Sequence, residues 1–172
     1  FQTASSHKLS VLKCGGDSRA ETVRNGLAAL LQQGLAAPHD NILVHDAARC
    51  CLPPEALSRL IQKAGGQAEG GILAVPVADT LKRADAAQHI GATVARAGLW
   101  QAQTPQLFQA ALLQRALDVG DLSAITDEAS AVEALGAQPL LVQGDSRNLK
   151  LTLPQDEYIV RLLLADKSHA PV

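Results

Sequence analysis

The sequence has no marked excess of either charge and no apolar run long enough to cross a membrane. Its 172 residues carry a formal net charge of −2. A chain so close to neutrality has no general attraction for nucleic acid or anionic lipid, and any phosphate must be held by a local cluster of cations. We therefore expect small anionic ligands rather than a nucleic acid or a membrane.

The three cysteines and five histidines form no disulfide or metal pattern. Cys50 and Cys51 are adjacent, and together with Cys14 they form no CxxC pair, which is typical of reduced thiols in a cytosol. The histidines lack ligand spacings such as HExxH, so we predict no zinc site. The amino end lacks the basic region and apolar stretch of a signal peptide, and we expect a cytoplasmic protein.

The sequence does contain enough apolar material for one ordinary domain, because 47% of its residues are hydrophobic. Short apolar runs alternate with helical patterns, which is typical of right-handed βαβ units. We therefore predict a single domain over residues 1–172, with an α/β fold, a mostly parallel sheet and flanking helices. The predicted strands are 9–12, 41–45, 71–77, 139–143 and 148–152.

Capping residues and glycines mark the ends of the predicted helices. Ser18 and Glu21 have capping-box spacing at the start of a helix that Gly34 ends. Thr126 and Thr152 are the predicted N-caps of two later helices. The apolar periodicity predicts that these helix positions are buried: Val23, Leu27, Leu30 and Leu31; Leu57, Leu60 and Ile61; Leu112, Leu113 and Leu117; Ile159, Leu162 and Leu163.

Residues 41–49, NILVHDAAR, place a carboxylate and two alanines directly after an apolar run. The run predicts a strand buried on both faces, with Asp46 at its carboxyl end. Ligands of open α/β sheets bind at that edge, and the acid, the small residues and Arg49 suit a nucleotide and its metal. The alternative is a simple turn in which Asp46 bonds nearby N–H groups, with Arg49 in a structural ion pair.

Residues 78–98 are more polar than their surroundings and predict an antiparallel hairpin. Two exposed strands bury little apolar surface by themselves. We expect this arm to be stable when something packs on it, most simply a second copy of the chain.

Six segments stand in an order and spacing that resemble one enzyme family. They are 15–23 (GGDSRAETV), 44–49 (VHDAAR), 78–83 (ADTLKR), 98–106 (GLWQAQTPQ), 125–130 (ITDEAS) and 148–152 (NLKLT). Together they resemble the 2-C-methyl-D-erythritol 4-phosphate cytidylyltransferases, from about Gly15 to the last helix. The resemblance implies isoprenoid-precursor synthesis by the non-mevalonate pathway, a Rossmann-like nucleotidyltransferase fold, and a homodimer joined by the arms.

The family begins with a strand, a Gly-rich loop containing an arginine, and a Pro-Lys pair, and these do not precede Phe1. In the family this segment cradles the triphosphate and supplies cations at the α-phosphate. We therefore expect the chain to be incomplete at its amino end.

The resemblance also implies roles for individual residues. Arg96 and Lys150 are the implied catalytic residues, which hold the substrate phosphate for in-line attack. Asp46 is implied to lie near Mg²⁺ and the substrate hydroxyls, and Thr80 and Thr126 to bond the methylerythritol. Thr80 and Arg96 lie on the arm and are implied to reach the other subunit's site. The residues implied to line the cytidine are Gly16, Asp17, Thr22 and Ala47.

Simpler explanations of these residues remain open at this point. Gly16 and Asp17 also suit an ordinary turn, and Arg96 and Lys150 also suit solvated surface charges. Thr126 suits a helix cap, and this role is compatible with ligand binding because a helix N-terminus attracts anions.

Two other functions also remain open. The same fold could act on another phosphorylated alcohol, such as ribitol phosphate, because few residues set an acceptor pocket. A nucleotide-binding remnant without catalysis is the second alternative, suggested by the missing Gly-rich loop.

Overall fold

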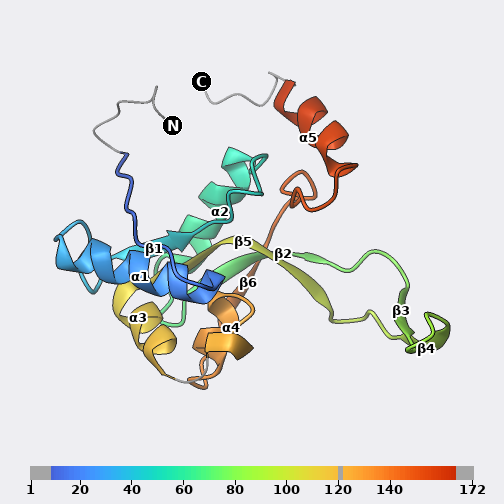
Figure 1. Ribbon diagram of the computed structural model, residues 1–172, viewed down its shortest axis with the longest axis horizontal. Helices are drawn as coiled ribbons and strands as arrows, with labels where there is room; N and C mark the ends of the chain where they lie inside the picture. The colour runs from blue at the N-terminus through green and yellow to red at the C-terminus, as the bar shows by residue number, and fades with distance from the viewer. Residues whose placement is uncertain (1–8, 120–121, 166–172) are drawn as a thin grey trace. The chain divides into compact units, whose positions relative to one another are not determined.

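The computed structural model describes residues 9–119 and 122–165, and the chain divides into two compact units (Figure 1). Unit 1 consists of Phe1–Ile42 and Phe108–Gln138, and unit 2 of Leu43–Leu107 and Pro139–Val172. Among the described residues, no helix has the length and apolar character needed to cross a membrane.

Unit 1 is mainly helical. Its helix α3 packs against both α1 and α4, and the buried side chains include Leu27, Leu113 and Val132. Ser18 caps α1 as predicted, and Gly34 follows its end with a positive φ of 67°. The elements are α1 (Arg19–Gln32), α3 (Ala110–Asp118), the short 3₁₀ helix η1 (Leu122–Ala124) and α4 (Glu128–Glu133).

Unit 2 contains most of the strands. Two strands, β1 (Asn41–Val44) and β5 (Trp100–Gln109), cross the boundary between the units. The remaining elements are α2 (Pro54–Ala64), β2 (Gly71–Pro76), β3 (Leu81–Ala84), β4 (Ile90–Val94), β6 (Leu140–Gln143) and α5 (Asp156–Ala165).

The main sheet is mixed rather than mostly parallel. Its strand order is β1-β5-β2-β6, with β2 parallel to β6 but antiparallel to β5. The prediction of a mostly parallel sheet is therefore wrong for the pair β2–β5. The reason is the connection: the chain leaves β2 through the arm and returns directly along β5, without the helical crossover that parallel neighbours need.

The strand β5 bulges in its middle. The register shifts between the pairs Ile72–Gln106 and Ala74–Ala102, so residues 103–105 of β5 lie opposite the single residue Leu73 of β2. Such bulges leave backbone groups outside the ladder and change the direction of side chains, and they are common beside functional sites.

The core of unit 2 lies between α2 and the strands β2 and β6. Leu60, Leu73 and Val142 are fully or almost fully buried there. The predicted core face of α2 is wrong at Ile61, which is 47% exposed. The buried stripe consists instead of Ala56, Leu60 and Ala64, at helical spacing of four residues.

Two predicted strands near the amino end differ from the structure. Residues 9–12 form no strand, and Val11 is largely exposed. The strand at Asn41–Val44 exists but is not buried on both faces, since Leu43 is 39% exposed. The strand β1 lies at the edge of the sheet order, where a strand has one neighbour. Local apolar patterns do not indicate whether a partner strand is present.

The predictions near the carboxyl end also need correction. Residues 148–152 form no strand, because the polar groups of Asn148 bond to β5 and to Arg49. The last helix begins at Asp156, whose carboxylate accepts the backbone N–H groups of Thr152 and Leu153. Its buried residue is Val160, whereas the predicted Ile159 and Leu162 are exposed.

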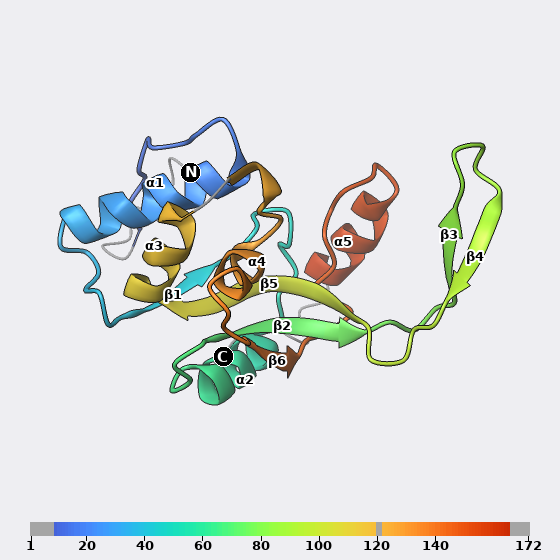
Figure 2. The same cartoon turned by 90° about the horizontal axis from the view of Figure 1, so that it is seen from below.

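The predicted hairpin arm is confirmed as a separate two-stranded antiparallel sheet of β3 and β4. Its register pairs Leu81 with Val94, and most of its side chains are exposed. Figure 2 shows the arm joined to the ends of β2 and β5 within unit 2.

Replacing Leu60 by alanine should lower the free energy of unfolding by about 2–5 kcal/mol, because a fully buried leucine leaves a cavity. The matched control is Ile61→Ala on the same helix, which should change it by about 0.5 kcal/mol or less. Urea unfolding measures both values. Equal losses in the two variants would contradict the observed core face of α2.

Candidate functional site

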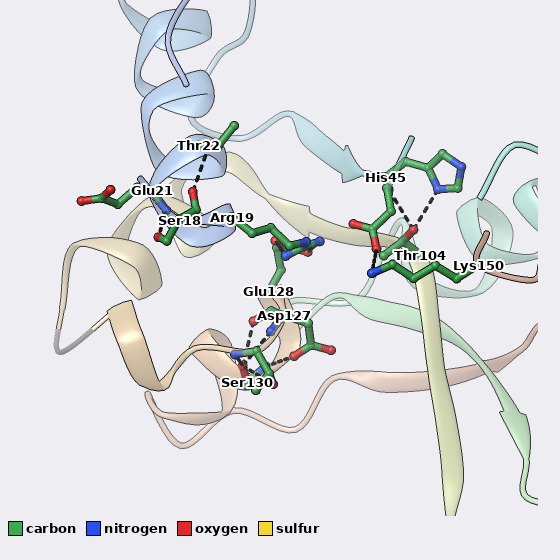
Figure 3. Close-up of polar contacts among 12 residues, drawn as sticks. Ser18, Arg19, Glu21, Thr22, His45, Thr104, Asp127, Glu128, Ser130 and Lys150 are labelled. Atoms are coloured by element: carbon green, nitrogen blue, oxygen red, sulfur yellow. Dashed lines mark hydrogen bonds and ion pairs between the residues drawn. The ribbon is translucent and has the colours of Figure 1, made fainter. Parts of the chain in front are cut away.

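The loop before α1 is fastened to the first turn of that helix (Figure 3). The N–H of Gly16 donates to Thr22 Oγ1 at 3.0 Å, and the N–H of Asp17 donates to Glu21 Oε2 at 2.8 Å. Ser18 Oγ accepts the N–H of Glu21 at 3.1 Å. The predicted capping box is thus present in a modified form, because the Glu21 carboxylate reaches Asp17 rather than Ser18.

The backbone at Gly16 is packed too closely for any side chain. A Cβ built there would lie 2.4 Å from the Cβ of Glu21. The hydroxyl of Thr22 both accepts from Gly16 and donates to the carbonyl of Ser18, so in this structure it stabilises the loop itself. Gly16 and Asp17 are exposed beside it, at the start of α1.

Thr126, which also lies in unit 1, was predicted to be an N-cap, and this prediction is wrong. The N-cap of α4 is Asp127, which forms a reciprocal capping box with Ser130. The backbone N–H of Thr126 donates to Ser130 Oγ at 3.1 Å. Thr126 therefore precedes the cap, and its segment is fastened to the first turn of α4.

A partly buried ion pair joins the starts of α1 and α4. Arg19 donates through both terminal nitrogens to the two carboxylate oxygens of Glu128, at 2.6 and 2.9 Å. The Glu128 side chain is 1% exposed. Two-point contacts of this kind fix the relative orientation of the groups as well as their distance.

In unit 2 the structure brings together Asp46 and Lys150. Lys150 Nζ lies 3.0 Å from Asp46 Oδ2, with side chains that are 47% and 16% exposed. The carboxylate is thus largely enclosed, while the ammonium remains half open to solvent. Ala47 is exposed next to Asp46, in a turn closed by the N–H of Arg49 donating to the Asp46 carbonyl at 2.9 Å.

Buried polar residues hold the segment that carries Lys150. Asn148 is fully buried, and its Nδ2 donates to the carbonyl of Thr104 at 2.8 Å. Gln103 donates to the carbonyl of Asp145 at 2.9 Å. Gln103 and Thr104 belong to the bulge of β5, so the irregular backbone there supplies the anchor. Sequence reasoning assigned no role to Gln103, Thr104 or Asn148, although all three lie in the motifs.

The same bulge holds the segment that carries Asp46. The backbone N–H of Asp46 donates to Thr104 Oγ1 at 3.0 Å, and this oxygen lies 3.0 Å from His45 Nδ1. His45 Nε2 lies 3.0 Å from the carbonyl of Arg49, which can only accept. Neutral His45 therefore carries its proton on Nε2, and the Thr104 hydroxyl donates to Nδ1.

Arg49 links the two segments directly. Its Nη1 donates to the carbonyl of Asn148 at 2.6 Å and its Nη2 to the carbonyl of Ala102 at 3.3 Å. Burial lowers the pKa of Arg49, and the charge of Asp46 opposes that change. The hydrogen-bond partners of Arg49 here are carbonyls, not the carboxylate of the predicted ion pair.

A charged network fixes the loop between β6 and Asn148. Hydrogen bonds from Arg147 lower the pKa of Asp145, and Arg147 also pairs with Glu55 at 2.8 Å. Arg59 donates to the carbonyl of Gln143 at 2.7 Å. These contacts tie the loop to α2, which carries Glu55 and Arg59.

Thr80 and Arg96 lie at the same end of the arm. Thr80 directly precedes β3, and Arg96 follows β4 by two residues. Both residues are exposed, at the end where the arm joins β2 and β5.

The carboxylate of Asp46 suits a shared metal rather than a metal held by protein ligands alone. Among the described residues, no group of three histidine, cysteine or acidic side chains could enclose an ion. Mg²⁺ is commonly bound through one or two carboxylates together with substrate phosphates and water. Asp46 fits that mode.

The predicted site residues form two groups, each within one unit. Unit 1 contains Gly16, Asp17, Thr22 and Thr126, and unit 2 contains Asp46, Ala47, Thr80, Arg96 and Lys150.

Comparisons with known proteins support one family. The model of the family described as IspD, 2-C-methyl-D-erythritol 4-phosphate cytidylyltransferase, matches residues 1–166. The chain is 74% identical over 157 residues to the cytidylyltransferase of that name from Neisseria gonorrhoeae strain NCCP11945, covering 91% of this chain and 68% of the relative. The relative from Chromobacterium violaceum is 57% identical over 158 residues, with 92% and 68% covered.

Solved structures agree with this match. A crystal structure of a 4-diphosphocytidyl-2C-methyl-D-erythritol synthase has a TM-score of 0.83 and 75% identity, covering 87% of this chain and 68% of that chain. The Francisella tularensis 2-C-methyl-D-erythritol 4-phosphate cytidylyltransferase has a TM-score of 0.78 and 32% identity, with 87% and 69% covered. The chain therefore belongs to the 2-C-methyl-D-erythritol 4-phosphate cytidylyltransferase family.

Proposed function

We propose that the protein transfers CMP from CTP to 2-C-methyl-D-erythritol 4-phosphate, giving 4-diphosphocytidyl-2-C-methyl-D-erythritol and pyrophosphate. The observation that carries this proposal is the 3.0 Å ion pair of Lys150 with Asp46, held by the bulge of β5 in a chain of this family. It places a half-exposed cation at a fixed point beside an enclosed carboxylate.

The reaction brings two polyanions together. A phosphate oxygen of the methylerythritol phosphate attacks the α-phosphorus of CTP, and the bond from that phosphorus to the pyrophosphate oxygen breaks. Unit like charges about 4 Å apart repel by about 4 kcal/mol at an effective dielectric of about 20. Because no protein nucleophile is required, catalysis consists of positioning and charge neutralisation.

Lys150 and Arg96 supply the cations for the acceptor phosphate in this proposal. Asp46 fixes the direction of the Lys150 ammonium, whose exposed side remains accessible to a phosphate oxygen. Arg96 is exposed at the end of the arm and has the length to reach an anion. Asp46 and Thr80 also accept hydrogen bonds from substrate hydroxyls.

A divalent metal, Mg²⁺, completes the proposal. Asp46 is the residue that would hold it, and when bound it neutralises charge on the triphosphate.

The nucleotide is assigned to the loop before α1. Gly16 and Asp17 are exposed, and because Gly16 has no side chain the backbone there can approach the base. Thr22 supports that loop, Ala47 lines the cytidine, and Thr126 contacts the methylerythritol.

The arm, residues 78–98, is proposed to join two copies of the chain into a homodimer. Its strands are exposed along nearly their whole length, and Ile90 is a large apolar residue open to solvent. An isolated two-stranded sheet is marginally stable in water, which favours packing on a second copy. In such a dimer, Thr80 and Arg96 reach the substrate site of the other subunit.

Incubation of the purified protein with CTP, Mg²⁺ and methylerythritol phosphate should release pyrophosphate. A coupled assay measures this release. Ribitol phosphate serves as the competing acceptor. Turnover with ribitol phosphate alone would contradict the proposed acceptor. CTP binding by calorimetry without turnover on either acceptor would instead favour the non-catalytic alternative.

Replacing Lys150 by alanine should lower kcat/KM for methylerythritol phosphate by about 100-fold or more, because it removes a positioned cation. The matched control is Lys63→Ala, an exposed lysine in the last turn of α2, which should leave the rate unchanged. Steady-state kinetics measure both. Equal rates in the two variants would exclude Lys150 from the site.

Mixing Arg96→Ala chains with Lys150→Ala chains should restore part of the activity if the arm serves the partner's site. In a heterodimer, one of the two sites then retains both cations. Activity is measured after the two chains are exchanged and the heterodimer is isolated by dual affinity tags. A verified heterodimer as inactive as either parent would exclude sharing across the interface.

A further inference from the structure

The ion pair of Arg19 with Glu128 places a cation where α1 does not need one, whereas Glu128, in the first turn of α4, suits the dipole of that helix. Arg19 is the first residue of α1, and a cation at a helix N-terminus is opposed by the helix dipole. The pair is also a weak source of stability, because the cost of taking the Glu128 carboxylate out of water offsets its attraction to Arg19, whose side chain is 35% exposed. The location of Arg19 therefore indicates a role in orientation rather than in the formation of α1.

Each partner of the pair is rigidly attached to a predicted ligand segment. Arg19 follows the loop of Gly16 and Asp17, whose N–H groups bond to side chains in the first turn of α1. The loop and the start of α1 thus form one rigid piece.

The other partner has the same relation to Thr126. Glu128 is the first residue of α4, and the N–H of Thr126 bonds to Ser130 in the first turn of that helix. The capping box of Asp127 and Ser130 makes this second piece rigid. Figure 3 shows Arg19 reaching from the start of α1 to Glu128.

We infer that Arg19 and Glu128 are positioning residues, which set the nucleotide loop at Gly16 and Asp17 relative to the Thr126 segment. The two contacts, at 2.6 and 2.9 Å, restrict rotation between the pieces, which a single-point contact would permit. The inference rests on the proposed function, because it assigns CTP to the loop at Gly16.

The decisive variant replaces both charges by apolar side chains, Arg19→Met with Glu128→Leu. Apolar replacement of an ion pair whose carboxylate is enclosed is commonly neutral or stabilising, so the urea midpoint should be equal or higher. The dissociation constant for CTP with Mg²⁺, measured by calorimetry, should rise about tenfold or more because the two pieces are no longer held in register.

Two measurements separate positioning from general damage. Amide hydrogen exchange at Gly16 and Asp17 should stay unchanged, because their bonds to Thr22 and Glu21 lie within one rigid piece. The matched control is Arg161→Met with Glu157→Leu, which removes an exposed ion pair of α5 and should leave CTP binding unchanged. If the apolar variant does not fold, the second variant is Arg19→Lys. It replaces the two-point contact with Glu128 by a single-point contact and should also weaken CTP binding.

The possible failures are distinguishable. A wild-type protein that does not bind CTP overturns the proposed function. A wild-type protein that binds CTP, with equal affinity in the Arg19→Met/Glu128→Leu variant, overturns only the positioning role. Equal weakening in the α5 control, or faster exchange at Gly16 and Asp17, would also overturn it, because the effect would then not come from orientation.

Discussion

The site in unit 2 depends on satisfying buried polar groups at the bulge of β5. Gln103, Thr104 and Asn148 are almost completely buried, and a buried polar group without a partner is costly. Their partners are the backbone and side chains of the segments that carry Asp46 and Lys150. Hydrogen bonding beneath the surface thus holds the two segments in an arrangement that brings the charges of Asp46 and Lys150 together.

Two irregular segments of unit 1 are held in the same way. In each, a loop that carries predicted ligand residues is bonded to the helix beside it, through Thr22 and Glu21 on α1 and through Ser130 on α4. A reaction between two phosphates needs little chemistry from the protein but needs fixed positions for charges and substrates. Short loops held in this way lose less conformational entropy on ligand binding than mobile loops do, because they are already ordered in the free protein.

Several local signals in the sequence predicted local structure correctly, although the N-cap predicted at Thr126 was wrong. The cap at Ser18, the glycine end of α1 and the hairpin arm depend on neighbours in sequence, and all were confirmed. The strands at 9–12 and 148–152 were wrong, because a strand needs a partner that lies far away in sequence. The strand β5, with a proline within it, has no alternating pattern and was not predicted.

For the candidate site, the motifs predicted individual residues, whereas the contacts between those residues came only from the structure. The resemblance indicated Asp46 and Lys150 separately, but their direct contact became visible only once both segments were placed on β5. Asn148, two residues before Lys150, shows why the motif could not be interpreted further: a polar residue in a short motif has the same appearance whether it binds a ligand or holds the backbone. Burial separates the two cases, since Asn148 is enclosed and bonded to β5 while Lys150 is half exposed. The motif NLKLT thus contains an anchor and a charge whose position that anchor sets.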